Sequence, residues 1–308
     1  MIIRAEHICR DYGNVKAVND VSFEVNEGEI FGFIGPDGSG KTTLFRILTS
    51  LILPDSGNAI IDGYDVIHDF RKVRSIIGYM PGQFSLYSDL TVEENLSFFA
   101  TVFGTTIEAN YHLIRDIYVQ IEPFKKRLAG RLSGGMKQKL ALSCALIHEP
   151  RVLVLDEPTT GVDAVSRQEF WELLKGLKAK KITILVSTPY MDEASLCDRI
   201  ALIQKGRLLA IDTPDRIVKT LGDEIVAVRT GDLYRLLNDL RSYPETCSVF
   251  PFGQDVHLTV KSQKTVPEDL RKYLQQKKHK HITIETITPG IEDIFMKLME
   301  KDELTMNN

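Results

Sequence analysis

The 308-residue sequence has no apolar run near the ~18–20 residues that a membrane-spanning helix requires. Its longest apolar runs, such as Val152–Leu155, have the length of a single strand. The first residues carry the charges of Arg4, Glu6 and Arg10 where a signal peptide would be apolar. The four cysteines lie far apart and form no CxxC pair. We therefore expect no disulfide framework and no structural metal, and a reducing, cytosolic environment.

The sequence also lacks an excess of basic charge. It has 38 Lys and Arg against 42 Asp and Glu, which gives a net charge of −4 and disfavours non-specific binding to nucleic acid. Apolar residues make up 43% and charged residues 26%, the balance of an ordinary globular protein that forms one large or two moderate domains. The basic run Lys277–His281 has no aromatic or glycine cradle, so we expect a solvated loop face there.

Short apolar runs alternate with helix-length segments through residues 1–222. The runs Glu29–Ile34, Val152–Leu155 and Ile182–Val186 have the continuous apolar character of strands buried on both faces of a parallel sheet. Helical periodicity follows the first of them, at Lys41–Leu51, and separates the other two, at Ser166–Ala179. Strand, crossover helix and strand in this order predict a doubly wound α/β domain.

Two regions depart from this alternation. Residues 91–148 look helical throughout, which predicts a helical insert. Residues 223–308 follow a shorter pattern that begins with a strand at Ile225–Val228 and ends with a helix at Ile291–Met299. The order β-α-β-β-α-β plus a helix predicts a small C-terminal α+β domain.

A glycine-rich turn follows the first apolar run. It matches the pattern GxxxxGK[ST] with the residues Gly35, Pro36, Asp37, Gly38, Ser39, Gly40, Lys41 and Thr42. The glycines let successive backbone N–H groups converge on phosphate oxygens, and the helix that begins there adds its positive dipole end. Lys41 would reach the β- and γ-phosphates and the Thr42 hydroxyl would ligate Mg²⁺. We therefore predict an ATP site, which Thr43 at the start of the helix also borders.

A second chemical signal comes where Val152–Leu155 runs into Asp156 and Glu157. In a parallel sheet, a strand that delivers carboxylates at its C-terminal end places them beside the phosphate loop. Asp156 suits the Mg²⁺ shell, and Glu157 can act as the general base that polarises an attacking water.

A third segment begins a helix after two glycines. It reads Leu132, Ser133, Gly134, Gly135, Met136, Lys137 and Gln138, with Ser133 as the predicted N-cap. This LSGGMKQ segment resembles the signature sequence of ATP-binding-cassette (ABC) proteins, and it lies between the phosphate loop and the Asp-Glu strand as it does in that family. Thr160–Asp163 resembles the family's D-loop, and Tyr12 resembles the aromatic residue that stacks on adenine.

The resemblance covers residues 2–222 and implies a P-loop NTPase cassette with an antiparallel β subdomain beside the helical insert. It also implies a head-to-tail dimer, in which two cassettes enclose two ATP molecules. Ser133 and Gly135 of each cassette would then serve the γ-phosphate bound by the other, with Gly134 and Asp163 beside them. The partner would be a second copy of this chain or a different cassette.

The segments Asp89–Asn95 and Pro289–Asp293 resemble the ABC-2 export branch of the family. That branch implies a separate membrane permease and a cytoplasmic location at the inner face of the cell membrane. The helical insert would receive the permease's coupling helices, with Arg71–Arg74 and Phe84–Asp89 at the border of that surface.

The sequence departs from the family at two positions. Pro189 stands where the family has a histidine that contacts the γ-phosphate, and proline offers neither a side-chain donor nor a backbone N–H. Locally we expect Thr188 to cap a helix that begins at Pro189. The family's glutamine position is Gly82, with Gln83 one place late, so that the Gln83 side chain either points away from Mg²⁺ or regains contact through a bulge at the glycine.

These observations predict an ATPase subunit of an exporter whose hydrolysis is slowed at its own site. The alternative is a cassette protein outside transport, soluble or acting on ribosomes or nucleic acid, that uses ATP binding mainly to dimerise. A single phosphate loop and a single LSGGMKQ disfavour the ribosome-associated type, which resembles two fused cassettes.

Overall fold

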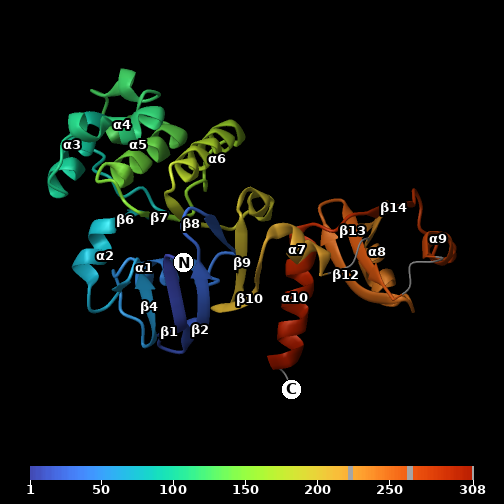
Figure 1. Ribbon diagram of the computed structural model, residues 1–308. Coiled ribbons are helices and arrows are strands. Elements are labelled where there is room, and N and C mark those ends of the chain that lie inside the picture. Colours follow the sequence, from blue (N-terminus) through green and yellow to red (C-terminus); the bar gives the residue numbers. More distant parts are fainter. Residues whose placement is uncertain (221–224, 262–265, 307–308) are drawn as a thin grey trace. The chain divides into compact units, whose positions relative to one another are not determined.

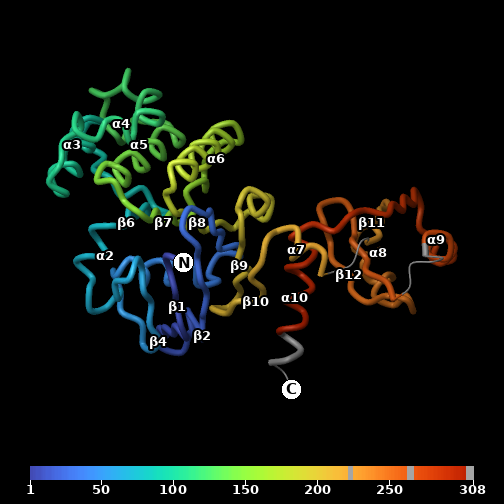
Figure 2. Tube along the Cα trace, viewed as in Figure 1, coloured from blue at the N-terminus to red at the C-terminus, as the bar shows by residue number. Residues whose placement is uncertain are grey.

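The computed structural model describes residues 1–220, 225–261 and 266–306. The chain divides into two compact units, Met1–Thr213 and Pro214–Asn308, whose elements are labelled in Figure 1 and can be followed along the chain in Figure 2. The predicted boundary between residues 222 and 223 lies outside the described residues. None of the described helices is long and apolar enough to cross a membrane.

The first unit is built on a six-stranded sheet with the strand order β10-β9-β3-β8-β7-β6. Its strands are β3 (Ile30–Ile34), β6 (Ile77–Met80), β7 (Val152–Asp156), β8 (Thr183–Thr188), β9 (Arg199–Gln204) and β10 (Arg207–Asp212). Five of them run parallel, and only β10 is antiparallel to its neighbour β9. Every residue of β3, β7 and β8 is buried, as expected for central parallel strands covered on both faces.

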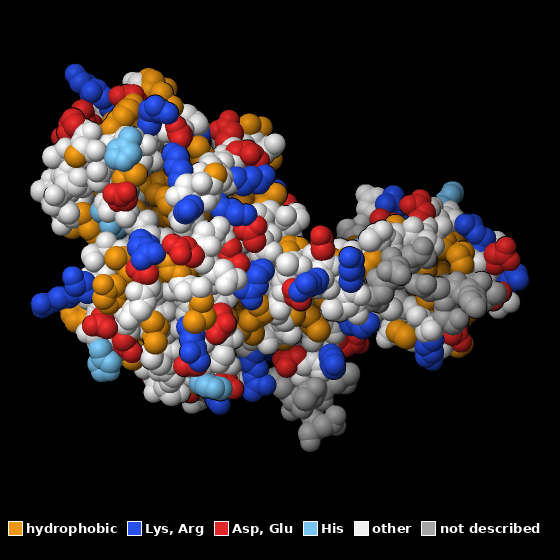
Figure 3. Space-filling model, in the orientation of Figure 1, with side chains coloured by type: hydrophobic (Ala, Val, Ile, Leu, Met, Phe, Trp, Pro, Cys, Tyr) orange, Lys and Arg blue, Asp and Glu red, His pale blue; other side chains and the backbone are white. Residues whose placement is uncertain are grey.

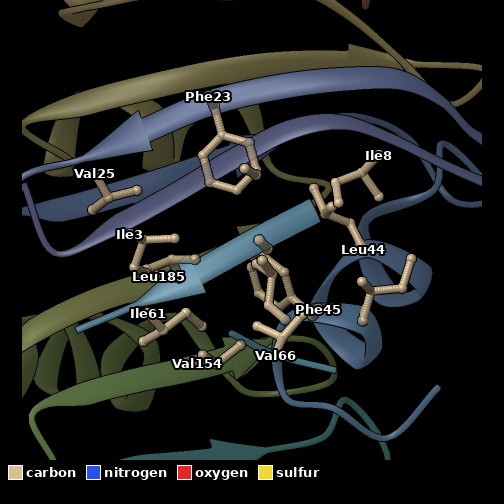
Figure 4. Close-up of a cluster of buried hydrophobic side chains, with 14 of the residues drawn as sticks. Ile3, Ile8, Phe23, Val25, Leu44, Phe45, Ile61, Val66, Val154 and Leu185 are labelled. Atoms are coloured by element: carbon tan, nitrogen blue, oxygen red, sulfur yellow. The ribbon is translucent and has the colours of Figure 1, made fainter. Parts of the chain in front are cut away.

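A second sheet in the same unit is antiparallel and has the order β2-β1-β4-β5. It consists of β1 (Ile3–Tyr12), β2 (Val15–Val25), β4 (Ser56–Ile61) and β5 (Tyr64–Asp65). Figure 4 shows the core between this sheet, the central sheet and helix α1 (Lys41–Leu48). Phe33 of β3 lies 5.0 Å from Phe23 of β2 and 5.5 Å from Phe45 of α1 between ring centroids. The predicted α/β class with an antiparallel subdomain is confirmed.

Helices surround the two sheets of this unit. They are α2 (Phe70–Ile76), α3 (Val92–Val102), α4 (Ile107–Tyr118), α5 (Gly134–Leu146) and α6 (Ala164–Ala179), with short 3₁₀ turns η1 (Glu122–Phe124), η2 (Ala129–Arg131) and η3 (Met191–Leu196). Figure 1 shows α3, α4 and α5 grouped at one end of the unit, and they form the predicted helical insert. α1 stops at Leu48, three residues before the predicted end at Leu51, because Ser50 takes a left-handed conformation with φ 55°.

The second unit is a four-stranded antiparallel sheet with the order β12-β13-β11-β14. Its elements are α7 (Pro214–Lys219), β11 (Ile225–Arg229), α8 (Leu233–Arg241), β12 (Thr246–Phe252), β13 (Asp255–Val260), α9 (Val266–Gln276), β14 (Thr283–Ile287) and α10 (Ile291–Met306). From β11 to α10 this is the predicted order β-α-β-β-α-β plus a helix. Leucines of α8 and α9 pack on Val226, Val228 and Leu258 to form its core.

The expected solvated face at Lys277–His281 is wrong for one residue. The His279 side chain is 2% exposed, and its Nε2 lies 2.9 Å from Asp239 Oδ2. Lys277 Nζ lies 3.3 Å from the other oxygen of the same carboxylate. These two partners lower the pKa of Asp239, although burial of its carboxyl opposes them. A half-buried carboxylate thus anchors this loop from α8.

We predict that Phe45→Ala lowers the free energy of unfolding of the Met1–Thr213 unit by about 3–5 kcal/mol, because the ring is fully buried against Phe33. The control is Ile60→Ala, since Ile60 on β4 is 37% exposed and should cost less than about 1 kcal/mol. Denaturant unfolding measures both. Equal losses in the two variants would contradict the packing described here.

Candidate functional site

The phosphate loop lies between β3 and α1, where two close approaches exclude any side chain larger than hydrogen. A Cβ on Gly35 would lie 2.2 Å from the Ile203 carbonyl oxygen. A Cβ on Gly40 would lie 2.2 Å from the Ala17 carbonyl oxygen, and Gly40 also has φ 107°. The loop is therefore packed against neighbouring backbone at both ends, and its curled shape is available before any nucleotide binds.

Two features of this loop fit an anionic ligand. The Ser39 hydroxyl, at the centre of the loop, is buried and has no hydrogen-bond partner among the residues that the structure describes. No side chain caps the N-terminus of α1, so the backbone N–H groups of its first turn, at Lys41, Thr42 and Thr43, are left without a side-chain acceptor. Orphaned donors beside a positive helix end are what a phosphate group would satisfy.

Lys41 extends from the start of α1 back across the loop. Its side chain is 2% exposed, and Nζ donates hydrogen bonds to the carbonyl oxygens of Gly35 at 2.7 Å and Pro36 at 2.9 Å. Nζ also lies 3.3 Å from Glu157 Oε1. The structure thus brings the two predicted catalytic residues into direct contact, even though more than a hundred residues separate them in the sequence.

Asp156 and Glu157 reach this point because β7 and β8 end together. Asp156 is the last residue of β7 and pairs in parallel register with Ser187 of β8. Thr188, the next residue of β8, accepts a hydrogen bond from the N–H of Gly35 at 3.3 Å. The carboxyl ends of three neighbouring strands therefore meet at the loop, the usual ligand position of an open α/β sheet.

The oxygen atoms at these strand ends fit a magnesium ion. Mg²⁺ prefers oxygen ligands and usually takes one or two from the protein, the rest from phosphates and water. The Thr42 hydroxyl and the Asp156 carboxylate are of this kind. In the described part of the chain, no group of three or more His, Cys, Asp or Glu side chains could hold a metal by itself. Any ion here would depend on ligands that accompany a nucleotide.

Tyr12 lies at the end of β1 and is 46% exposed, so one face of its ring is available to a base. The Arg10 guanidinium lies 5.2 Å from the ring centroid, and Arg10 Nη1 donates to Asp55 Oδ1 at 2.6 Å. The other Asp55 oxygen accepts from the N–H of Asp11 at 2.7 Å. Sequence reasoning missed this support, because Asp55 is far from Tyr12 along the chain and lies in no motif.

The signature segment lies at the N-terminus of α5, where Ser133 is the N-cap, as predicted, and accepts from the N–H of Met136 at 3.4 Å. Asp163 caps α6 in the same way, and the N–H of Ser166 lowers the pKa of this carboxyl. A Cβ on Gly135 would lie 2.7 Å from Ser166 Oγ, so the two helix starts are adjacent. Among the described residues, no hydrogen bond or ion pair joins this pair of helix starts to the phosphate loop.

The end of β8 corrects one local prediction. Thr188 does not cap a helix that begins at Pro189, because β8 continues through Thr188 and the 3₁₀ turn η3 begins at Met191. The Thr188 hydroxyl instead accepts from the N–H of Tyr190 at 3.0 Å. Pro189 therefore lies in a bend between strand and turn and brings no donor to the site.

Gly82 and Gln83 lie in the segment that follows β6. A Cβ on Gly82 would lie 3.1 Å from the carbonyl oxygen of Asp156, so the glycine lies next to the end of β7. Gln83 lines a groove of about 340 Å³. Its apolar lining includes Met80, Phe84, Leu86, Phe99, Phe103 and Ala141.

The groove lining also contains polar residues, among them Arg74, Gln138 and His148. His148 stacks on Phe103 at 3.8 Å between ring centroids, and burial lowers the pKa of the imidazole. Its Nε2 lies 3.1 Å from the Ile77 carbonyl oxygen and must donate to it, which leaves Nδ1 as an acceptor with no partner in the described residues. The groove thus combines aromatic and aliphatic side chains with a few polar ones, and one of these carries an unused acceptor.

Comparisons with known proteins point in one direction. The family model described as ABC transporter matches residues 18–160. The chain is 38% identical over 288 residues to the probable multidrug ABC transporter ATP-binding protein YbhF of Escherichia coli K12, an alignment that covers 92% of this chain and 49% of that protein. The chain thus spans about half the length of that relative.

Other relatives match along their whole length. The chain is 34% identical over 303 residues to the Nod factor export ATP-binding protein I of Burkholderia lata, with 96% of each protein covered. Among solved structures, the dimeric bacterial ABC transporter cassette MJ0796 matches with a TM-score of 0.63 and 26% identity, over 69% of this chain and 98% of that one. CbiO1 of Clostridium perfringens, part of the transporter complex cbiONQ, matches with the same TM-score and identity, over 70% and 90%.

We predict that Ser39→Ala leaves the melting temperature of the nucleotide-free protein unchanged or slightly higher, because it removes a buried hydroxyl that has no partner. The same change should weaken nucleotide binding several-fold. Thermal unfolding with and without ATP measures both effects. A clear loss of stability without nucleotide would show that the hydroxyl serves the fold instead.

Proposed function

The chain belongs to the ABC transporter family of ATP-binding cassettes, and on that premise we propose that it is the ATP-binding and ATP-hydrolysing part of an exporter. The observation that carries this proposal is the contact of Lys41 with Glu157 at the phosphate loop, beside Asp156. The relatives named for multidrug and Nod factor export support the export direction. The Asp89–Asn95 and Pro289–Asp293 segments favour the ABC-2 branch.

In this proposal, the loop residues Gly35–Thr43 hold the triphosphate. Lys41 exchanges its carbonyl partners for β- and γ-phosphate oxygens, which also releases Glu157 from the ion pair. The Tyr12 ring stacks on the adenine. Arg10, which is bonded to Asp55, holds the Tyr12 ring in place. Binding therefore separates the two catalytic side chains, Lys41 and Glu157, that contact each other in this structure.

For hydrolysis, Thr42 and Asp156 hold Mg²⁺, which neutralises charge on the phosphates when bound. Glu157 then orients a water molecule and takes up its proton as the water attacks the γ-phosphorus. The bond from this phosphorus to the oxygen bridging to the β-phosphate breaks, and ADP and phosphate leave. The Glu157 side chain is 22% exposed, so water has access to it. Ser133, Gly134, Gly135 and Asp163 act on the nucleotide held by a second cassette, which the dimeric structure of a similar cassette supports.

We propose that hydrolysis at this site is slow. Pro189 supplies no donor for the γ-phosphate, and Gly82 supplies no side chain beside Asp156. The Gln83 side chain lies in the groove lining and replaces neither. ATP binding depends on the loop and on Lys41, so it should remain normal.

The partner cassette is a second copy of this chain or a different cassette. The dimeric structure of a similar cassette supports pairing, and the intact LSGGMKQ segment would complete the partner's site. A different cassette could have histidine at the position of Pro189 and glutamine at the position of Gly82. The dimer would then have one fast and one slow site.

The groove beside the helical insert is the surface that we assign to the membrane permease. Its aromatic lining suits an amphipathic helix, and the segment from Gly82 to Leu86 connects it to the metal-binding strand end. On the face seen in Figure 3, basic and acidic side chains are interspersed among the residues drawn in colour. That face offers no continuous basic surface of the kind that nucleic-acid binding uses.

We predict that Pro189→His raises the ATP turnover rate by about tenfold or more, because it restores a donor for the transition-state charge. Pro189→Ala, which restores only the backbone N–H, should stay slow. Steady-state phosphate release measures both. If the wild type already turns over as fast as Pro189→His, the proposed slowing is wrong. If neither protein hydrolyses ATP but both dimerise with it, the dimerisation-only alternative is correct.

We predict that Phe84→Ala lowers the amount of the chain retained on salt-washed native membranes about tenfold, as expected for a central aromatic contact. Phe124→Ala is the matched control. Each ring carries a cation over its face, Lys137 at 5.2 Å from Phe84 and Arg127 at 4.5 Å from Phe124, but only Phe84 lines the groove. Nucleotide affinity should not change in either variant. Equal retention of the two variants would exclude the groove as the docking surface.

A further inference from the structure

Ser187 is a polar residue at the end of an otherwise apolar strand, and no motif includes it. It is fully buried, and β8 presents it in register with Asp156 of β7. Its Oγ lies 2.7 Å from Asp156 Oδ1 and 2.9 Å from the backbone nitrogen of Glu157. One hydroxyl therefore contacts both acidic residues of the proposed site.

The direction of both hydrogen bonds is fixed by their partners. A peptide N–H can only donate, so Ser187 Oγ accepts from Glu157. The hydroxyl has one proton, which it donates to the Asp156 carboxylate. Asp156 is itself 2% exposed, so this donor stands in place of water at that oxygen.

Glu157 takes a backbone conformation that needs such support. Its φ is 49°, in the left-handed region that costs a residue with a Cβ roughly 1–2 kcal/mol. Its N–H is held by two acceptors of one residue, the Oγ of Ser187 at 2.9 Å and the carbonyl oxygen of Ser187 at 3.1 Å. In this conformation the Glu157 carboxylate reaches Lys41.

We propose that Ser187 is a positioning residue that orients the metal-binding Asp156 and the general base Glu157 at once. This inference rests on the proposed function. Through Ser187, β8 contributes to hydrolysis independently of residue 189, where proline replaces the histidine of the family. Loss of the hydroxyl would leave Asp156 Oδ1 without its buried donor and Glu157 with the carbonyl contact alone. The phosphate loop would keep its own contacts.

The test compares three variants. Ser187→Ala removes the hydroxyl, and Ser187→Thr keeps it on a side chain that strands accommodate. Ser143→Ala is the control, because Ser143 on α5 is also fully buried and its hydroxyl donates to the Lys139 carbonyl oxygen at 2.8 Å, outside the site. Thermal unfolding establishes that each variant is folded.

The first readout is the ratio of the Kd for ATP in EDTA to the Kd for ATP in Mg²⁺, which needs no turnover. We expect Ser187→Ala to lower this ratio about tenfold because the Kd for ATP in Mg²⁺ rises, while the Kd in EDTA stays within about twofold of wild type. The second readout is kcat for ATP hydrolysis, which should fall about 10–100-fold. Ser187→Thr should recover both values, and Ser143→Ala should match wild type.

Three results would overturn the inference: a Ser187→Ala variant with an unchanged ratio, equal losses in Ser187→Ala and Ser143→Ala, or a Ser187→Thr variant that loses as much as Ser187→Ala. Failure of the proposed function looks different. A folded wild type that binds no nucleotide in EDTA or in Mg²⁺ would reject the ATP site itself. A wild type that binds ATP with slow turnover still decides the inference by the Kd ratio.

Discussion

The parallel register of β3, β8 and β7 is the constraint on which the site depends. It sets Asp156 opposite Ser187 and brings the Thr188 carbonyl to the N–H of Gly35. The phosphate loop is far from the proposed metal ligand and the proposed general base in the sequence, and this pairing brings them together. A shift of one residue in the pairing of β7 would turn Asp156 to the other face of the sheet, away from the loop.

The same constraint explains how the fold tolerates Pro189 and Gly82. The end of β8 is held by backbone hydrogen bonds and by the Thr188 hydroxyl, which bonds to Tyr190. None of these contacts needs a side chain at residue 189. Gly82 fits closely beside the Asp156 carbonyl oxygen, where a larger residue would have to displace its neighbour slightly. The fold is therefore satisfied at these two positions, and the proposed slowing of hydrolysis would come from catalysis alone.

Local signals predicted most of the fold and the core of the site. Ser133 caps its helix as expected, because capping depends on residues three positions apart. The buried strands were visible as apolar runs. Thr188 was misread because the strand pairing continued past the point where the helix signals began. Ser187, Asp55 and His279 act through partners distant in the sequence, so no local pattern could identify their contacts.

In a dimer, the two altered positions and the signature segment of this chain would affect different nucleotide sites. A head-to-tail pair forms each nucleotide site from the loop of one cassette and the signature helix of the other. Pro189 and Gly82 belong to the loop side, whereas Ser133, Gly134 and Gly135 belong to the signature side. A homodimer would therefore have two slow sites. In a dimer with an unaltered cassette, the slow site would use the phosphate loop of this chain. The signature segment of this chain would complete the fast site, at the phosphate loop of the other cassette. The slow site would then hold ATP through repeated cycles at the other, because Lys41 and the curled loop remain complete.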